Sequence, residues 1–367
     1  MKQKTSLFAF LLIVMTVSCI VFVPISSYGQ ISNIGSFIQS GQQDANVLAK
    51  SYLDPLGEGF GPTLNAGWIN SVSPHKLLGF DISLRIGASV VPSDARTFSA
   101  TALSLQNLSY QSGPSNSPTI SGPKSSGATF DVSQTVNGQK YSMGTFTMPR
   151  GTGWHAVPAP MIQAGIGLIK GTSIMFRFLP KTSVHNYGDV QLWGVGIHHS
   201  VNQWIPEGKL LPVKISVFAA YTKLQTNSPL TINPVTDANT TDPYSNSNNT
   251  WNGQAVNSTT SAFTVNAIVG KSLPFIGFFA GVGYESSTMK VNTPGSYPVT
   301  VPDPTVSNPS HKVVDKIDNP ISITMNGANS FRGLVGLQFK LAFFHINAEY
   351  VIAKYRVLST GISFSFR

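Results

Sequence analysis

The sequence predicts an all-β protein, a transmembrane antiparallel up-and-down β-barrel of about 12 strands (range 10–14) with a short N-terminal helical plug segment. Three observations lead to this fold class. Apolar and polar residues alternate along most of the chain. Most alternating segments reach the roughly 9 to 11 residues that a tilted strand needs to cross a bilayer. Short connections between them alternate with long ones rich in Ser, Asn, Thr and Pro.

The composition is typical of a membrane protein without spanning helices. Of the 367 residues, 41% are hydrophobic and only 11% are charged, whereas a soluble domain has about 25% charged residues. Beyond the N-terminus, no run approaches the ~20 apolar residues of a spanning helix. The net charge is +9, but Lys and Arg are scattered singly, unlike the basic stripe of a nucleic-acid surface. We therefore expect outer-membrane lipid, and no nucleic acid, as a partner.

Residues 1–29 have the pattern of a signal peptide. Lys2 and Lys4 precede an apolar stretch, and small residues at 27–29 predict cleavage before Gln30. Cys19 is the only cysteine and falls within this leader, in a poor context for lipidation. We expect the mature chain to be exported and to contain no disulfide.

Residues 30–60 form the predicted helical segment. Within 44–56, Asp44 is the expected N-cap, Pro55 interrupts the pattern, and four apolar residues share one helical face: Val47, Leu48, Tyr52 and Leu56. A single amphipathic helix in a barrel protein needs a place to bury its apolar face. The lumen would provide that place, so we interpret 30–60 as a plug.

Residues 61–367 are assigned to the barrel. The expected strands are 63–69, 78–90, 160–169, 172–179, 189–200, 213–224, 255–271, 275–289, 331–341, 345–353 and 356–366. These are about eleven strands, whereas bacterial barrels usually have an even number. Either a strand near 141–147 is missing from this set, or 30–60 enters the lumen from the outer side. We favour the second interpretation.

The alternation assigns one face of each strand to lipid and the other to the lumen. A soluble sandwich would carry Lys and Glu on its polar faces, but here these faces hold mainly Ser, Gly and Thr. The charged residues on them are the lumen-facing candidates: Asp81, Arg85, Lys214, Arg332 and Lys340. Gly277, Gly281 and Gly283 also face inward, where a small residue allows a kink or a contact with the plug.

The chain ends on an alternating, Phe-rich strand, 358–366. Ring closure would remove its free edge. Such a last strand resembles the signal read by the outer-membrane assembly machinery, a predicted partner, although Arg367 replaces the usual terminal aromatic residue. With this end in the periplasm, the long loops 92–159, 225–253 and 291–330 face outward. The five tryptophans, Trp68 included, are expected near the membrane interfaces.

The sequence contains no recognisable catalytic motif. It has no Gly-x-Ser-x-Gly, no Gly-x-x-x-x-Gly-Lys, no His-Glu-x-x-His and no Asp-rich calcium loop. His198 and His199 are adjacent on an expected strand, so they point to opposite faces and cannot hold one metal ion together. We therefore predict no catalytic residues, no metal, no cofactor and no enzymatic activity.

Several stretches resemble an uncharacterised family of Bacteroidota outer-membrane β-barrels: DANVLAKSYLDPLGEGFGPTLNAGWINSVSPHKLLGFDISLRIGASVVPSDARTF, PAPMIQAGIGLIKGTSIMFRFLP, LWGVGIHHSVNQWIPEGKLLPVKISVFAAYTKL and GISFSFR. The resemblance covers most of the mature chain and implies location in the bacterial outer membrane. In outline this family is similar to long-chain fatty-acid transporter barrels, in which an N-terminal hatch blocks the lumen and hydrophobic ligands leave sideways into the bilayer. No short motif is shared with those transporters, so no site residue is implied.

Three functions remain open from the sequence. The one we prefer is a plugged channel for the uptake of small hydrophobic compounds. The second is a structural or partner-binding outer-membrane barrel with extracellular interaction loops. The third is a general porin with an open polar channel.

Overall fold

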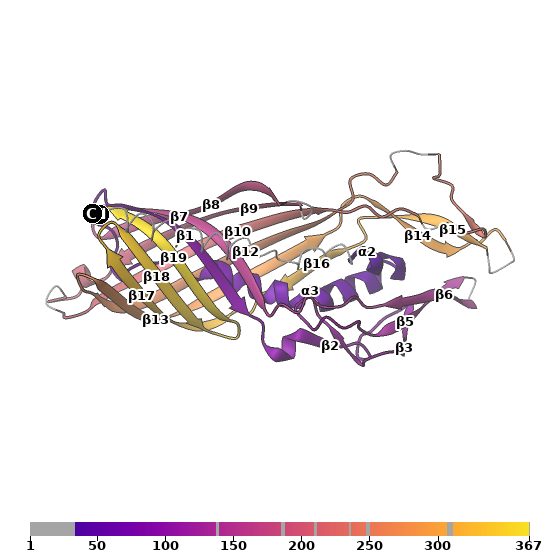
Figure 1. The fold of residues 1–367 in the computed structure, drawn as a ribbon, viewed down its shortest axis with the longest axis horizontal. Helices are drawn as coiled ribbons and strands as arrows, with labels where there is room; N and C mark the ends of the chain where they lie inside the picture. Colours follow the sequence, from indigo (N-terminus) through magenta and orange to yellow (C-terminus); the bar gives the residue numbers. More distant parts are fainter. Residues whose placement is uncertain are drawn as a thin grey trace, which may run out of the picture.

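The computed structural model describes residues 34–136, 139–184, 188–208, 211–234, 236–246, 250–306 and 311–366. The predicted signal peptide and Cys19 lie outside these residues. Ten antiparallel strands close into a barrel, and an eleventh, β16, pairs outside the ring (Figure 1). The predicted fold class, an antiparallel transmembrane barrel with a short N-terminal helix, is confirmed.

Strands of the ring run alternately away from and toward the C-terminal end of the barrel. Their order around the ring is β1 (Phe80–Val90), β7 (Ala156–Gly167), β8 (Thr172–Val184), β9 (Gly188–Ser200), β10 (Lys214–Pro229), β12 (Ala255–Ser272), β13 (Ile276–Asn292), β17 (Ser330–Leu341), β18 (Phe344–Ile352) and β19 (Arg356–Phe366). β19 pairs with β1, and Phe366 lies opposite Phe80. The last strand therefore has a partner on each side and no free edge.

The two ends of the barrel differ in their connections. Four comparatively short ones, such as 168–171 and 342–343, lie at the end that holds the C-terminus, which we call the turn end. Three long ones, 91–155, 230–254 and 293–329, lie at the opposite end, which we call the lobe end. The long loops expected from the sequence overlap these three connections.

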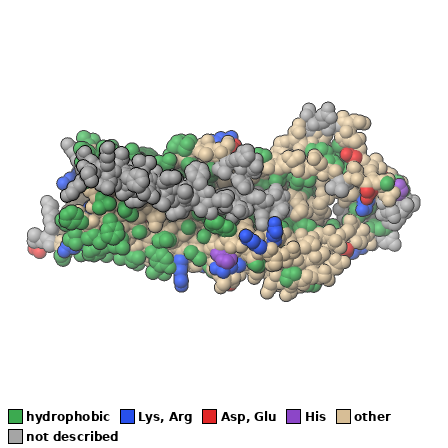
Figure 2. Space-filling model, in the orientation of Figure 1, with side chains coloured by type: hydrophobic (Ala, Val, Ile, Leu, Met, Phe, Trp, Pro, Cys, Tyr) green, Lys and Arg blue, Asp and Glu red, His purple; other side chains and the backbone are tan. Residues whose placement is uncertain are grey.

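The barrel exterior is apolar and the interior is polar. In β1, Ile82 and Leu84 are exposed, whereas the alternate residues Asp81, Ser83 and Arg85 are buried. Figure 2 shows hydrophobic side chains gathered over the barrel part of the molecule. This orientation is the reverse of a soluble barrel and is the one expected for strands in contact with lipid.

A helix enters the barrel from the lobe end. Two short turns, α2 (Ile34–Phe37) and η2 (Ile38–Ser40), precede α3 (Gln42–Asn65). α3 contacts strands on several sides of the ring, β1, β7, β10, β12, β13 and β19 among them. Its 24 residues span about 36 Å at roughly 1.5 Å per residue, so it reaches from the lobe end into the lumen.

Two sequence-based expectations about this helix are wrong. The N-cap is Gly41, and the Asp44 carboxylate instead accepts hydrogen bonds from the backbone N–H groups of 106–108, at 2.8, 2.7 and 3.0 Å. The helix also continues through Pro55 and Pro62. Buried packing on the lumen wall outweighs the helix-breaking tendency of these prolines.

The expected strand 63–69 does not form. Thr63 lies in the last turn of α3, and an irregular stretch of residues 66–79, which we call the inner segment, then leads to β1. Trp68, expected at a membrane interface, is 1% exposed and packs inside the barrel with Ile69, Met175 and Phe218. Seven alternating residues are too few to separate a strand from a helix end, and without this strand the ring has an even count.

Small sheets at the lobe end are made by the long connections. We call these connections together the lobe. Its sheets are formed by β2 (Thr97–Ser99), β3 (Leu108–Ser112), β4 (Asn116–Pro118), β5 (Thr129–Val136), β6 (Gln139–Thr147), β11 (Thr240–Thr241), β14 (Ser296–Pro302) and β15 (Lys312–Asp318). The lobe also contains the 3-10 turn η3 (Ser93–Arg96) and β16 (Ser322–Asn326), which pairs with β13. A further 3-10 turn, η4 (Asn202–Trp204), lies at the turn end. The segment 141–147, considered as a missing barrel strand, belongs to β6 outside the ring.

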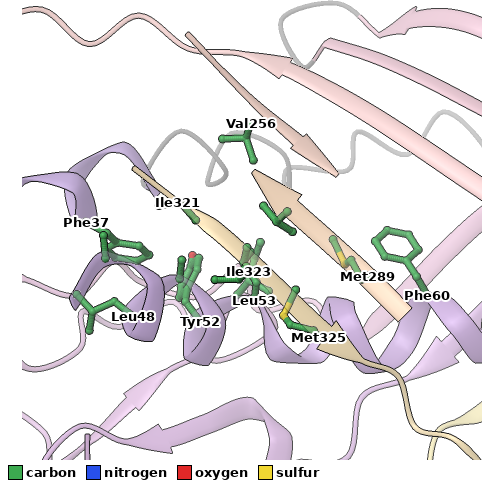
Figure 3. Packing of buried hydrophobic residues seen from close by; sticks show 14 of the residues in the cluster. Phe37, Leu48, Tyr52, Leu53, Phe60, Val256, Met289, Ile321, Ile323 and Met325 are labelled. Carbon is green, nitrogen blue, oxygen red and sulfur yellow. The ribbon is translucent and has the colours of Figure 1, made fainter. Parts of the chain in front are cut away.

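α2 and the N-terminal half of α3 share one hydrophobic core with the lobe. Phe37, Leu48 and Tyr52 pack in the same cluster as residues of the long connections: Ile120, Phe130, Tyr297, Ile321 and Ile323. Figure 3 shows the helix side of this cluster, with Leu53 and Phe60 lying toward Met325 and Met289. The lobe is therefore folded around the helix.

Candidate functional site

The candidate site is built where α3 ends inside the barrel. Arg177 of β8 donates from Nη1 to the Leu64 carbonyl oxygen and from Nη2 to the Ala66 carbonyl oxygen, both at 2.7 Å. A cation at a helix C-terminus complements the helix dipole and binds carbonyl groups that lack intrahelical partners. The Arg177 guanidinium carbon also lies 3.9 Å from the centroid of the Trp68 ring. Arg177 therefore holds both the end of α3 and the start of the inner segment.

Other strands hold the inner segment through its backbone. Gln163 of β7 accepts a hydrogen bond from Arg177 Nε at 2.9 Å and donates to the Trp68 carbonyl oxygen at 2.8 Å. Ser216 of β10 donates to the Val72 carbonyl oxygen at 2.7 Å. Since β7, β8 and β10 lie within one run of neighbouring strands, these side chains fix the inner segment along one wall of the ring.

An ion-pair network on the opposite wall reaches the same segment. Arg332 of β17 donates to Glu285 of β13 at 3.1 Å, and its second terminal nitrogen lies 3.9 Å from Glu349 of β18. Glu349 accepts a hydrogen bond from the Gly67 N–H at 2.8 Å. Gly67 has a φ of 68°, a conformation that favours glycine. Charges this deeply buried require such partners.

Arg85 and Asp81 do not pair directly with each other. The Asp81 carboxylate accepts from Asn70 Nδ2 at 2.8 Å and lies 2.6 Å from His75 Nε2, so its partners are on the inner segment. Arg85 is 2% exposed, and its three guanidinium nitrogens have no hydrogen-bond partner among the described residues. Its charge lies in the same interior as those of Glu349 and Asp81.

The remaining sequence-based candidates lie near the turn end or on β13. Lys214 is exposed at the start of β10, and Lys340 is half-buried near the end of β17. The nearest atoms to a Cβ at Gly281 and Gly283 belong to the neighbouring strand β12, and those at Gly277 belong to Gln338 and Lys271. The structure thus brings Asp81, Arg85 and Arg332 into the polar interior.

Toward the lobe end, an apolar cleft of about 60 Å³ opens between α3 and the barrel wall. Its lining residues come from α3, from the strands and from the long connections: Leu53, Leu56, Phe60, Ile120, Ser121, Thr152, Trp154, Ala156, Val157, Pro158, Thr226, Ser228, Val256, Ser258, Met289 and Val291. None of these described lining residues is charged. The cleft can therefore take up apolar groups, with hydroxyls as its main side-chain hydrogen-bonding groups.

The cleft and the polar interior follow each other along the barrel. At roughly 30 Å³ per water, the cleft has room for about two water volumes, so it accommodates one end of a small apolar molecule. Closer to the turn end, the lumen is occupied by Arg177, the network around Arg332 and the inner segment. A ligand larger than this space would have to displace α3 or the lobe to pass.

Several residues of this interior were missed in the sequence, although the strand alternation contains a signal for them. Arg177 lies between the outward residues Phe176 and Phe178, so its inward direction follows from strand periodicity. Glu285 and Glu349 can be placed inward in the same way. Which inward charges meet across the lumen could not be deduced, because the partners are far apart in the chain.

No group of three or more His, Cys, Asp or Glu residues that could hold a metal ion occurs among the described residues. Within the same part of the chain, none of the helices combines the length and apolar character required to cross a membrane.

Known structures with a similar arrangement include three bacterial proteins. Ail, the attachment invasion locus protein of Yersinia pestis, has a TM-score of 0.24 and 10% identity over 79% of this chain and 100% of that chain. The translocator domain of autotransporter NalP from Neisseria meningitidis has a TM-score of 0.25 and 9% identity over 80% of this chain and 90% of that chain. The toluene transporter TbuX of Ralstonia pickettii has a TM-score of 0.23 and 9% identity over 84% of this chain and 98% of that chain. Similarities at these TM-scores carry no argument about function.

Sequence comparison identifies the family without identifying an activity. No curated protein matches the chain. A family model matches residues 1–366, and the chain therefore belongs to the family of unknown function DUF6588.

Proposed function

We propose that this protein is a plugged barrel of the bacterial outer membrane that takes up small hydrophobic compounds. The observation that carries the proposal is the uncharged cleft between α3 and the barrel wall at the lobe end. The lobe end would face outward and the turn end would face the periplasm, as in barrels with long outer and short inner connections. Lipid would surround the apolar exterior, and assembly machinery would read the C-terminal strand.

An open polar channel is the less favoured function. A porin needs a continuous water-filled lumen, whereas α3 and the inner segment fill the interior around Trp68 and Arg177. We also propose that the protein has no enzymatic activity. The fatty-acid-transporter resemblance and a Bacteroidota origin remain predictions from the sequence.

The lobe supports a second candidate function, the binding of an extracellular partner. The long connections form small sheets that share one core with α3, with Tyr297 and Phe130 fully buried in it. A folded lobe presents a defined surface to a partner, which unstructured loops would not do. We rank this function second because no described surface feature specifies the partner's chemistry.

A quenching experiment tests the uptake proposal. Trp154 lines the cleft, so 1-bromobutane bound there should quench its fluorescence in protein reconstituted into nanodiscs. The difference between wild type and Trp154→Phe isolates this residue from the lipid-facing Trp193. We expect a saturable component of quenching in the wild type.

Substitutions of Leu56 provide the matched pair. Leu56→Asp places a charge on the half-buried, cleft-facing side of α3 and should abolish the saturable component, because an apolar ligand cannot solvate a carboxylate. Leu56→Met keeps the apolar character and should retain it. Equal saturable quenching in Leu56→Asp and wild type would contradict the proposal.

A further inference from the structure

A second cavity, of different chemistry, lies at the turn end. Its volume is about 330 Å³, within the roughly 300–1,000 Å³ of typical ligand pockets. The inner segment forms one side through residues such as Ser73 and His75, and the ring forms the other through residues such as Gln338 and Lys340. Most of its lining side chains are polar, whereas the cleft at the lobe end is apolar.

Lys340 supplies the cavity with a positive charge that no described carboxylate balances. Its Nζ donates to the Ser272 hydroxyl and to the Leu273 carbonyl oxygen, the latter at 3.0 Å. An ammonium group has three N–H donors, so one is left for a ligand. In the described part of the chain, no carboxylate forms an ion pair with Lys340.

The carboxylate that lines the cavity is already occupied. Asp81 lies 2.6 Å from His75 Nε2 and accepts from Asn70 Nδ2 at 2.8 Å. Its negative charge is therefore directed to the inner segment. Lys340 and the exposed Lys76 remain as positive groups at the cavity, together with the Ser365 hydroxyl. The Gln338 amide nitrogen is already directed to His345 Nδ1 and Asn347 Oδ1.

We propose that this cavity binds a small oxyanion, a carboxylate or phosphate group, with Lys340 as its principal contact. A lysine ammonium is a common point-charge contact for phosphate and carboxylate oxygens, and hydroxyls of the lining serines, such as Ser365, can complete the coordination. A bound oxyanion would contact both the wall and the inner segment. The proposal does not depend on hydrophobic uptake, since it concerns the opposite end of the barrel and other residues.

Calorimetric titration with inorganic phosphate, and separately with citrate, tests the proposal. Full-length protein is used in a non-ionic detergent, so that no lipid phosphate competes. Low ionic strength keeps the contact between Lys340 and the anion from being screened. We expect saturable binding of at least one anion, about tenfold or more weaker in Lys340→Gln, because one charge-assisted contact is lost. Lys340→Arg keeps the charge and should retain binding.

A lysine at the same end of the barrel serves as the control. Lys214 is exposed and does not line the cavity, so Lys214→Gln should bind like wild type. Heat-dependent electrophoretic mobility verifies that each variant is a folded barrel. Repeating the titration in nanodiscs with anionic phospholipid distinguishes the source of the oxyanion, since competition there indicates a lipid headgroup. Unchanged affinity in folded Lys340→Gln, equal loss in Lys214→Gln, or no anion binding by the wild type would overturn the proposal.

Discussion

Replacing Arg177 by Met tests how the end of α3 is held in the lumen. The substitution keeps an apolar stem beside Trp68 but removes three donors: to Leu64 and Ala66 at 2.7 Å and to Gln163 at 2.9 Å. We expect the helix end and the inner segment to leave their closed position more often. The barrel itself should remain intact, because its ladder of backbone hydrogen bonds does not involve the Arg177 side chain.

The free-energy cost of Arg177→Met follows from the hydrogen bonds that each acceptor retains. The Leu64 carbonyl oxygen still accepts from Trp68 Nε1 at 3.2 Å, so it is not orphaned. The Ala66 carbonyl oxygen and the Gln163 amide oxygen each lose the hydrogen bond from Arg177, which destabilises the closed position by about 1–3 kcal/mol each. Loss of the buried cation–π contact adds about 2 kcal/mol. Release of the buried charge returns several kcal/mol. A net loss of about 3 kcal/mol corresponds to a roughly 100-fold larger open population.

Single-channel recording in planar bilayers measures this population. Wild-type protein should conduct little, and Arg177→Met should open far more often at the same voltage. Arg356→Met is the matched control, because Arg356 is exposed at the lobe end of β19. If folded Arg177→Met and Arg356→Met conduct alike, the contacts of Arg177 do not hold the lumen closed.

Two further predictions concern close packing and acid stability. A Cβ at Gly61 would overlap the Ser287 side chain, whereas one at Gly333 would meet nothing within 4 Å. Overpacking costs about 1–3 kcal/mol and helix propensity returns up to about 1 kcal/mol, so Gly61→Ala should lower Tm. Adding Ser287→Gly to Gly61→Ala removes the overlapping side chain and should raise Tm again. Gly333→Ala is the control, because its added Cβ overlaps no neighbouring atom. In the lobe, the Ser296 hydroxyl donates to Asp318 at 2.6 Å and, with Lys316, holds the pKa of that carboxyl below its ordinary 3.8. The stability it contributes should be complete above pH 3.8 and lost as the pH falls through the lowered pKa. Titration by NMR should show a higher pKa for Asp318 in Ser296→Ala; an unchanged pKa would exclude this hydrogen bond as its cause.

Strand alternation predicted the ring because each strand has only two faces. A run such as 176–178, Phe-Arg-Phe, has one orientation that spares the charge from lipid. The same rule placed Asp81, Arg85 and Arg332 inward, where the structure buries them. It could not identify Arg177 as the residue that binds the end of α3, because Leu64 and Ala66 precede it by a long stretch of chain and share no local pattern with it.

The lobe was less predictable for a different reason. Its core residues Ile120, Phe130, Tyr297 and Ile321 occur in Ser-, Pro- and Thr-rich surroundings, so no period of two or 3.6 marks a strand or helix. Their burial depends on α3, which supplies Leu48 and Tyr52 from another part of the chain. A loop composition therefore concealed a folded unit that exists only around the helix.

Both halves of α3 are held by directed hydrogen bonds, and this limits how uptake through the cleft could occur. In the N-terminal half, the Asp44 carboxylate accepts from the backbone N–H groups of 106–108, and the Tyr52 hydroxyl donates to the Arg150 carbonyl oxygen at 3.0 Å. At the other end, Arg177 donates to the Leu64 and Ala66 carbonyl oxygens. A shift of the whole helix would break hydrogen bonds at both ends. On the proposed function, the end of an apolar ligand would therefore enter the cleft by movement of lining side chains between these two anchored ends, and the helix would stay in the lumen. A helix that stays in place explains how a barrel could admit hydrophobic molecules without conducting ions.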